Sequence, residues 1–135
     1  MIRLTIGPRQ YLGKLELEQA PATCAALRSL LPLRGRILQA RWSGEALWIP
    51  LGDRRLGLLA ENAKTHPASG EILLYPGDVS EMEILIPYGQ THFGCKYGEL
   101  AGNHFATILD AGADWTDFGE RVWWHGAQDV TIDEV

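Results

Sequence analysis

Two strand-forming runs joined by a tight turn occupy the densest part of the sequence, Gly70–Ile108. The first run is Glu71–Tyr75, and Pro76–Asp78 forms the turn, because proline presets φ and glycine adopts a positive φ without steric cost. The second run starts at Glu81 and alternates between two faces until Pro87, whose missing N–H is expected to end the strand. Its apolar face consists of Met82, Ile84 and Ile86, and its mixed face of Glu81, Glu83 and Leu85. This stretch therefore predicts antiparallel strands with one face in a core.

The N-terminal part of the sequence predicts a β-hairpin followed by a helix. Apolar and polar residues alternate over 2–6 and again over 14–18, with turn residues between them. Pro21 suits the first turn of a helix, and Pro32 ends the helix. Cys24 lies on the apolar stripe of this helix, which predicts a buried thiol.

The C-terminal part predicts a strand, a second helix and a closing strand. The strand run places Phe105, Thr107 and Leu109 on one face and His104, Ala106 and Ile108 on the other. Asp114 can cap the helix and Gly126 can end it, because acidic caps and C-terminal glycines favour these positions. The apolar stripe of the helix is Trp115, Phe118 and Val122. The alternation over 130–132 predicts a last strand that pairs with the first and completes a barrel.

A further hairpin is predicted around Ser43-Gly44, which has the composition of a two-residue turn. Pairing across that turn sets Arg41 opposite Ala46. It assigns Leu38, Ala40, Leu47 and Ile49 to one face, and Gln39, Arg41 and Trp48 to the other. An arginine beside a tryptophan can hold a carboxylate against a flat wall, or can be a solvated cation–π pair, and the solvated pair is the more common arrangement.

Composition limits the class of protein. A chain of 135 residues with 46% hydrophobic residues is long enough for one domain, residues 1–135, with a core that needs no disulfide. A net charge of −5 argues against binding to nucleic acid. The sequence contains no signal-peptide pattern and no apolar run of membrane-spanning length. We therefore expect a cytoplasmic protein with no membrane or nucleic-acid partner, in which Cys24 and Cys95 are free thiols. Association with further copies of the chain stays open.

No phosphate-binding loop, dinucleotide fingerprint, HExxH motif, nucleophile elbow or kinase signature is present in the sequence. Of the four histidines, only His92 and His104, together with Cys95, approach the spacing of metal ligands, and they lack a fourth partner. We therefore predict no metal site and no cofactor.

The strongest polar group in the sequence is formed by Lys96, Asn103 and His104, with the aromatic residues Tyr88 and Phe93 nearby if the chain doubles back at its glycines. Lys96 and Asn103 can orient a small anion or amide, and His104 can exchange protons near neutral pH. The alternative is structural, with Asn103 closing a turn, His104 satisfied in the core or at its rim, and Lys96 solvated. The residues alone leave the two readings even.

Two glutamates, Glu45 and Glu83, are candidate general bases on one condition. A carboxyl acts as a proton acceptor near neutral pH only where burial raises its pKa. Whether either side chain is buried depends on the fold.

Three blocks of the sequence carry a resemblance to a known family. They are ARWSGEALWIPL at Ala40–Leu51, GEILLYPGDVSEMEILIPYG at Gly70–Gly89 and LAGNHFATI at Leu100–Ile108. With the predicted order of hairpins and helices, these blocks resemble the bacterial cyclophilin-like proteins of unknown function. The resemblance implies a mainly β protein, a small closed cyclophilin-like β-barrel with two helices.

Prolyl isomerases of the cyclophilin fold carry an aromatic-His-Arg motif whose arginine polarises the prolyl amide. Arg41 is the one position that can stand for that arginine, and Ala40 occupies the place of the histidine. The sequence thus departs from the isomerase pattern.

The sequence therefore predicts a protein that binds a small carboxylate- or amide-bearing metabolite in a pocket on the side of the barrel. The residues expected at this pocket are Arg41, Trp48, Tyr88, Phe93, Lys96, Asn103 and His104. One alternative is an atypical prolyl isomerase, with Arg41 acting on the amide and Phe93 lining a proline pocket. Another is an interaction module of a larger amide-hydrolysing assembly, since related barrels occur there. The sequence leaves open whether the protein is an enzyme.

Overall fold

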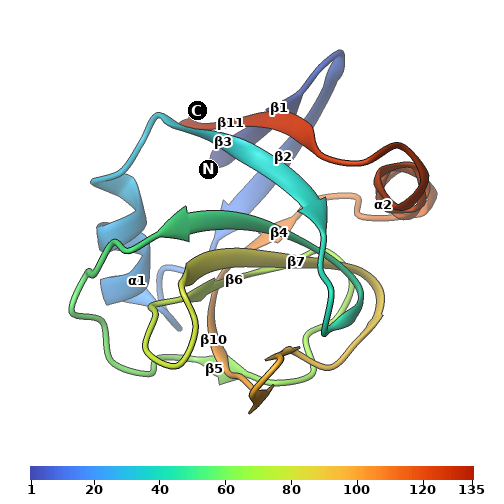
Figure 1. Cartoon of the computed structure of the whole chain (residues 1–135). Helices are drawn as coiled ribbons and strands as arrows, with labels where there is room; N and C mark the ends of the chain where they lie inside the picture. Colours follow the sequence, from blue (N-terminus) through green and yellow to red (C-terminus); the bar gives the residue numbers. More distant parts are fainter.

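The computed structural model describes residues 1 to 135 and has a closed antiparallel β-barrel with two helices (Figure 1). The strands are β1 (Ile2–Ile6), β2 (Arg9–Leu15), β3 (Leu33–Gln39), β4 (Gly44–Gly52), β5 (Ala63–Lys64), β6 (Glu71–Tyr75), β7 (Met82–Thr91), β8 (Gly94–Cys95), β9 (Gly98–Glu99), β10 (Gly102–Ile108) and β11 (Gln128–Glu134). The helices are α1 (Pro21–Arg28) and α2 (Ala113–His125). The predicted mainly β class, with a small closed barrel and two helices, is confirmed.

Eight strands form the barrel in the order β2-β1-β11-β3-β4-β7-β6-β10, and β10 pairs with β2 to close the ring. The predicted opening hairpin is present, with Leu4 opposite Tyr11, but its second strand is Arg9–Leu15 and not the predicted run over 14–18. The predicted pairing of the last strand with the first is also confirmed, with Leu4 opposite Ile132. Closure leaves these strands without the long free edge that an open sheet would expose. The short β8 and β9 pair only with each other and lie outside the ring.

The two helices lie on opposite sides of the barrel (Figure 1). α1 has Pro21 in its first turn and buries Cys24 and Leu27, so the predicted burial of the Cys24 thiol is confirmed. α2 buries the predicted stripe of Trp115, Phe118 and Val122. Neither helix is long and apolar enough to cross a membrane.

The prediction that Asp114 caps α2 is wrong. The helix starts earlier, with Gly112 at the N-cap, and Asp114 lies within the first turn. There the Asp114 carboxylate accepts a hydrogen bond from the Tyr11 hydroxyl at 2.7 Å and one from Arg9 at 3.2 Å. Asp114 therefore ties the start of α2 to the β1–β2 hairpin.

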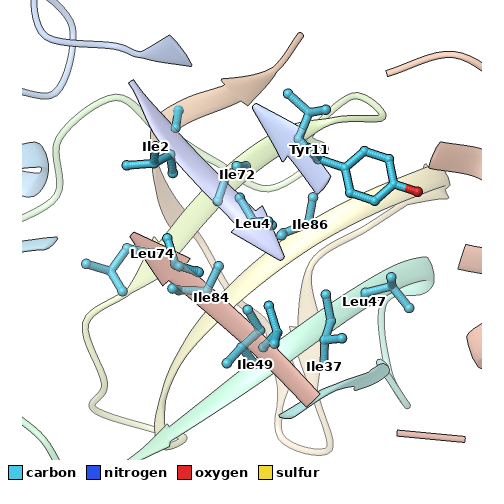
Figure 2. Packing of buried hydrophobic residues seen from close by; sticks show 14 of the residues in the cluster. Ile2, Leu4, Tyr11, Ile37, Leu47, Ile49, Ile72, Leu74, Ile84 and Ile86 are labelled. Carbon is cyan, nitrogen blue, oxygen red and sulfur yellow. The ribbon is translucent and has the colours of Figure 1, made fainter. Parts of the chain in front are cut away.

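The main core is a cluster of 26 buried residues, made of the inward-facing side chains of the barrel strands together with the buried residues of α1 and α2 that pack on the barrel. Figure 2 shows branched side chains from opposite walls, among them Leu4, Ile49, Ile72 and Ile84, pointing toward one another. Close packing of this kind makes the interior a solid core, so a ligand site has to lie elsewhere.

A second, smaller core covers the outer face of β6 and β7. Its buried members are Ala40, Ala46, Leu73, Tyr75, Leu85, Phe93 and Leu100. Phe93 and Leu100 come from the segment that contains β8 and β9, so this segment lies over the outer wall of the barrel. The predicted alternation of β7 is confirmed, since Met82, Ile84 and Ile86 face the interior and Leu85 faces outward.

The predicted two-residue hairpin at Ser43-Gly44 is wrong by one residue of register. β3 ends at Gln39, which pairs with Leu47, and a longer loop leads to β4. A one-residue shift exchanges the faces of a strand, so Ala40 lies in the outer cluster while Leu47 fills the barrel. The reason is long-range, because Ser43 binds the covering segment through the His92 N–H at 3.0 Å and through Gly94.

Two further predictions about strands are wrong. Pro87 does not end β7, which continues to Thr91 past an irregularity in its pairing with β4. The Pro87 carbonyl accepts hydrogen bonds from the Gly70 N–H at 3.0 Å and from the Trp115 indole at 2.8 Å. In β10 a bulge between His104 and Ala106 breaks the alternation, so that Phe105 and Ala106 both join the barrel core.

Gly119 is required where α2 crosses Tyr88. A Cβ atom at Gly119 would lie 2.2 Å from the Tyr88 ring, so Gly119→Ala forces the helix away from the barrel. We expect a loss of about 1–3 kcal/mol in the free energy of unfolding, measured by urea denaturation. Glu120→Ala, at the exposed next position, is the control and should change stability little. Because alanine is the better helix former, a more stable Gly119→Ala protein would contradict the close contact.

Candidate functional site

A cavity of about 440 Å³, which we call the side pocket, lies on the outer face of the barrel. Its walls come from the end of β3 and the following loop, from Trp48 on β4, from Glu83 on β7 and from Cys95–Tyr97. The pocket exists because the β8–β9 segment covers the outer wall only in part. Its size falls within the range of small-molecule sites.

Glu83 is the buried acidic residue of this pocket, with 6% of its surface exposed. Strand alternation turns it outward between Tyr75 and Pro50, its neighbours on β6 and β4. Burial raises the pKa of its carboxyl from 4.5 to about 8, and the negative charge of Glu81 adds to the shift. No protein group holds the carboxyl by a hydrogen bond or an ion pair. Every side-chain oxygen that is fully enclosed in this structure has a hydrogen-bond partner. The Glu83 oxygens have none, so they are not fully enclosed and are accessible from the pocket.

Two cationic side chains, Arg41 and Lys96, line the same pocket. Both are exposed, and neither takes part in an ion pair. The Lys96 ammonium lies 5.0 Å from the centre of the Tyr97 ring. The half-buried Trp48 and the exposed Trp42 add aromatic surface. The pocket therefore combines free positive charge, flat apolar walls and a carboxyl that is uncharged at neutral pH.

The structure brings together three of the predicted ligand-binding residues and separates the others. Arg41, Trp48 and Lys96 share the side pocket. Phe93 is fully buried and lines a neighbouring groove, and Tyr88 is buried against α2. The expected grouping of Lys96 with Asn103 and His104 does not form, because the last two lie on β10 away from the pocket.

The Asn103 side chain forms hydrogen bonds with three other residues. Its amide nitrogen donates to the Thr23 hydroxyl at 3.1 Å and to the Leu59 carbonyl at 3.0 Å. Its amide oxygen accepts the Glu61 N–H at 3.1 Å. These contacts connect α1 and the loop before β5 to the barrel, and they correspond to the structural alternative for this residue.

His104 is also held by protein groups. Thr107 donates its single hydroxyl hydrogen to Glu16 at 2.8 Å, so it accepts a hydrogen bond from His104 Nε2 at 2.7 Å. Glu71 lies 3.4 Å from His104 Nδ1. Burial lowers the pKa of His104, and the charge of Glu71 acts in the opposite direction. The lowered pKa favours a neutral imidazole at neutral pH, and its one N–H, on Nε2, is taken up by Thr107.

An open groove of about 1080 Å³ adjoins the side pocket and shares Trp42, Ser43, Gly94 and Cys95 with it. In the groove the His66 and His92 rings stack with centroids 4.2 Å apart, and His92 Nε2 lies 2.6 Å from Glu99 Oε2. The sequence does not predict this pair, because His66 and His92 are 26 positions apart and no local pattern links them. No group of three or more His, Cys, Asp or Glu side chains is arranged to hold a metal ion.

These features define a closed eight-stranded antiparallel barrel with a candidate small-molecule pocket on its outer wall. The chain belongs to the family described as "Protein of unknown function (DUF3830)", whose family profile matches residues 4–133. No curated protein matches the chain significantly in sequence.

Two solved structures are similar to this fold. The structure of McbB in complex with tryptophan has a TM-score of 0.77 at 18% identity, and the match covers 99% of this chain and 44% of McbB. This chain thus spans less than half the length of McbB. The solution structure of the hypothetical protein AF2241 from Archaeoglobus fulgidus has a TM-score of 0.60 at 17% identity, covering 99% of this chain and 93% of AF2241. At these identities the likeness shows the fold alone.

The raised pKa of Glu83 makes stability depend on pH. Below pH 4.5 the carboxyl is protonated in the folded and unfolded states alike, and burying it carries no ionisation penalty. Between pH 4.5 and about 8 only the unfolded chain releases the proton, so stability falls by up to about 1.4 kcal/mol per pH unit. Glu83→Gln should remove this slope in urea denaturation.

The control for this prediction is Glu81→Gln, which removes a neighbouring carboxyl that is less buried. It should retain most of the slope. A wild-type slope that persists in Glu83→Gln would show that Glu83 ionises normally in the folded protein.

Proposed function

We propose that this barrel is cyclophilin-like and that it binds a small metabolite with a carboxylate or amide group in the side pocket. The observation that carries the proposal is the combination of two unpaired cations, Arg41 and Lys96, with the partnerless carboxyl of Glu83 in one cavity. A buried carboxyl without a partner reduces stability, and a leucine there would avoid the cost. A ligand that pairs with these three groups would explain why a carboxyl is buried here without a protein partner.

Each group has a distinct task in this proposal. The Arg41 guanidinium can take a carboxylate by two parallel hydrogen bonds, and Lys96 supplies a mobile point charge. The protonated Glu83 donates a hydrogen bond to a carbonyl or carboxylate oxygen, which an ionised glutamate cannot do. Trp48 and the exposed Trp42 and Tyr97 offer aromatic faces to the apolar part of the ligand.

The similar fold of McbB, which is described in complex with tryptophan, suggests a first probe. Tryptophan carries both a carboxylate and an aromatic ring, and these are the two features that the side pocket can bind. Tryptamine has the same ring without the carboxylate and is the matched control ligand.

The alternative of a prolyl isomerase receives less support. It requires Arg41 and Phe93 to act on one peptide bond, but Arg41 lines the side pocket and Phe93 lines the adjoining groove. A proline peptide in the same screen tests this alternative directly.

The binding experiment is a thermal-shift screen of small carboxylates, amides and ureido compounds, with tryptophan, tryptamine and a proline peptide included. A ligand at about 100 times its dissociation constant adds roughly 2.7 kcal/mol to stability, on the order of 10 °C for this chain length. We expect carboxylates to raise the melting temperature and tryptamine to leave it unchanged. Arg41→Ala and Lys96→Ala should each weaken binding about tenfold, by analogy with other charge-assisted hydrogen bonds.

The control variant is Arg34→Ala, an exposed arginine on β3 that lines none of the three cavities described. Equal losses in Arg34→Ala and Arg41→Ala would mean that net charge, not the pocket, attracts the ligand. A response to the proline peptide alone would favour the isomerase alternative.

The protonation of Glu83 predicts how binding changes with pH. Above about pH 8 the carboxyl ionises and repels an anionic ligand, so affinity should fall as the pH rises through that value. Glutamine keeps an uncharged hydrogen-bond donor, so Glu83→Gln should bind well at pH 7 and lose the pH dependence. Calorimetric titration at several pH values measures both effects. A pH profile that is the same in wild type and Glu83→Gln would remove Glu83 from the binding mechanism.

A further inference from the structure

A third cavity, of about 330 Å³, lies beside the last turns of α2. We call it the α2 pocket. Its lining residues are Gly44, Glu45, Tyr88, Glu120, Trp123 and Trp124, and none of them belongs to the side pocket. It is therefore a separate place on the molecule, with a different chemistry.

The walls of the α2 pocket include the most exposed tryptophan of the chain. Trp123 and Trp124 are 59% and 79% exposed, while the buried stripe of α2 consists of other residues. The two indoles therefore contribute little to the core. Glu120 lies three and four residues before them, a spacing that puts side chains on one face of a helix.

A second carboxylate, that of Glu45, is held in place at the same cavity. Glu45 Oε1 accepts the Gln90 N–H at 2.9 Å. The side chain lies against Gly89, where an added Cβ would come within 2.4 Å of Glu45 Oε1. Neither Glu45 nor Glu120 forms an ion pair, so both negative charges are uncompensated.

The two sides of the cavity are fixed relative to each other. α2 is joined to β7 by the Trp115 indole, which donates to the Pro87 carbonyl, and by the Thr116 hydroxyl, which donates to the Tyr88 carbonyl at 3.3 Å. Gly119 lets the helix rest on the Tyr88 ring. Burial raises the pKa of the Tyr88 phenol, and the negative charges of Glu45 and Glu120 add to the shift. Both carboxylates therefore act electrostatically on the wall of this cavity.

We propose that the α2 pocket binds an organic cation of the alkylammonium class, with a methylated or quaternary nitrogen held against Trp123 and Trp124. The face of an indole attracts such a cation, which sheds water more readily than a bare ammonium. Glu45 and Glu120 neutralise its charge from two sides. The volume of the pocket is in the range of small-molecule sites, and no Lys, Arg or His side chain lines it that could occupy the place of the ligand's cation.

The test is a titration of the isotope-labelled full chain with choline chloride, followed by the indole N–H signals in nuclear magnetic resonance. We expect saturable shifts of the Trp123 and Trp124 signals, and about tenfold weaker binding in Trp124→Leu and in Glu120→Gln. The control is Trp42→Leu, which removes an indole of similar exposure (58%) at the other two cavities and should bind choline normally.

A neutral ligand separates cation binding from hydrophobic contact. Dimethylbutanol, the uncharged isostere of choline, should shift these signals far less. Equal binding of the two compounds, an equal loss in Trp42→Leu, or no saturable shift with choline or with a trimethyllysine peptide would overturn the proposal. Tighter binding of the peptide than of choline would support the site and identify a protein side chain as the source of the cation.

Discussion

The burial of β7 on both faces is the constraint on which the rest of this structure depends. Residues 82–88 are all buried, although a strand on the wall of a barrel needs only every second residue inside. The inward residues Ile84 and Ile86 belong to the barrel core, and the outward Leu85 requires a cover of its own. The segment with β8 and β9 supplies that cover through Phe93 and Leu100.

This double burial also creates the chemistry of the side pocket. Glu83 occupies an outward position between Tyr75 and Pro50 and is only 6% exposed, so its carboxyl has lost most of its contact with water. The cost appears as a pKa raised to about 8, because an ionised group loses more hydration than a neutral one. The same segment carries Lys96, while the loop tied to it through Ser43 carries Arg41. The covering segment and the loop bonded to it therefore bring both cations to the cavity that Glu83 lines.

Local patterns in the sequence predicted most of the strands and both helices, and failed where distant contacts outweigh local preference. The register of β3 and β4 shifted because Ser43 bonds to backbone groups of residues 92–94. Pro87 stays within β7 because its carbonyl has partners from residue 70 and from Trp115. The bulge at Phe105 places two successive residues in the core, which no alternating pattern can anticipate.

The features of the candidate site also divide into those set by local sequence pattern and those set by distant contacts. By itself the sequence determined the β class, the closing strand, the inward and outward faces of β7, and the outward position of Glu83, because these follow from the two-residue periodicity of a strand without a bulge. Only the tertiary structure decided that Glu83 is buried, that Arg41 and Lys96 line the same cavity, and that Asn103 and His104 bind protein groups instead. Burial and proximity depend on which distant segment covers a surface, and that information is not contained in the spacing of neighbouring residues.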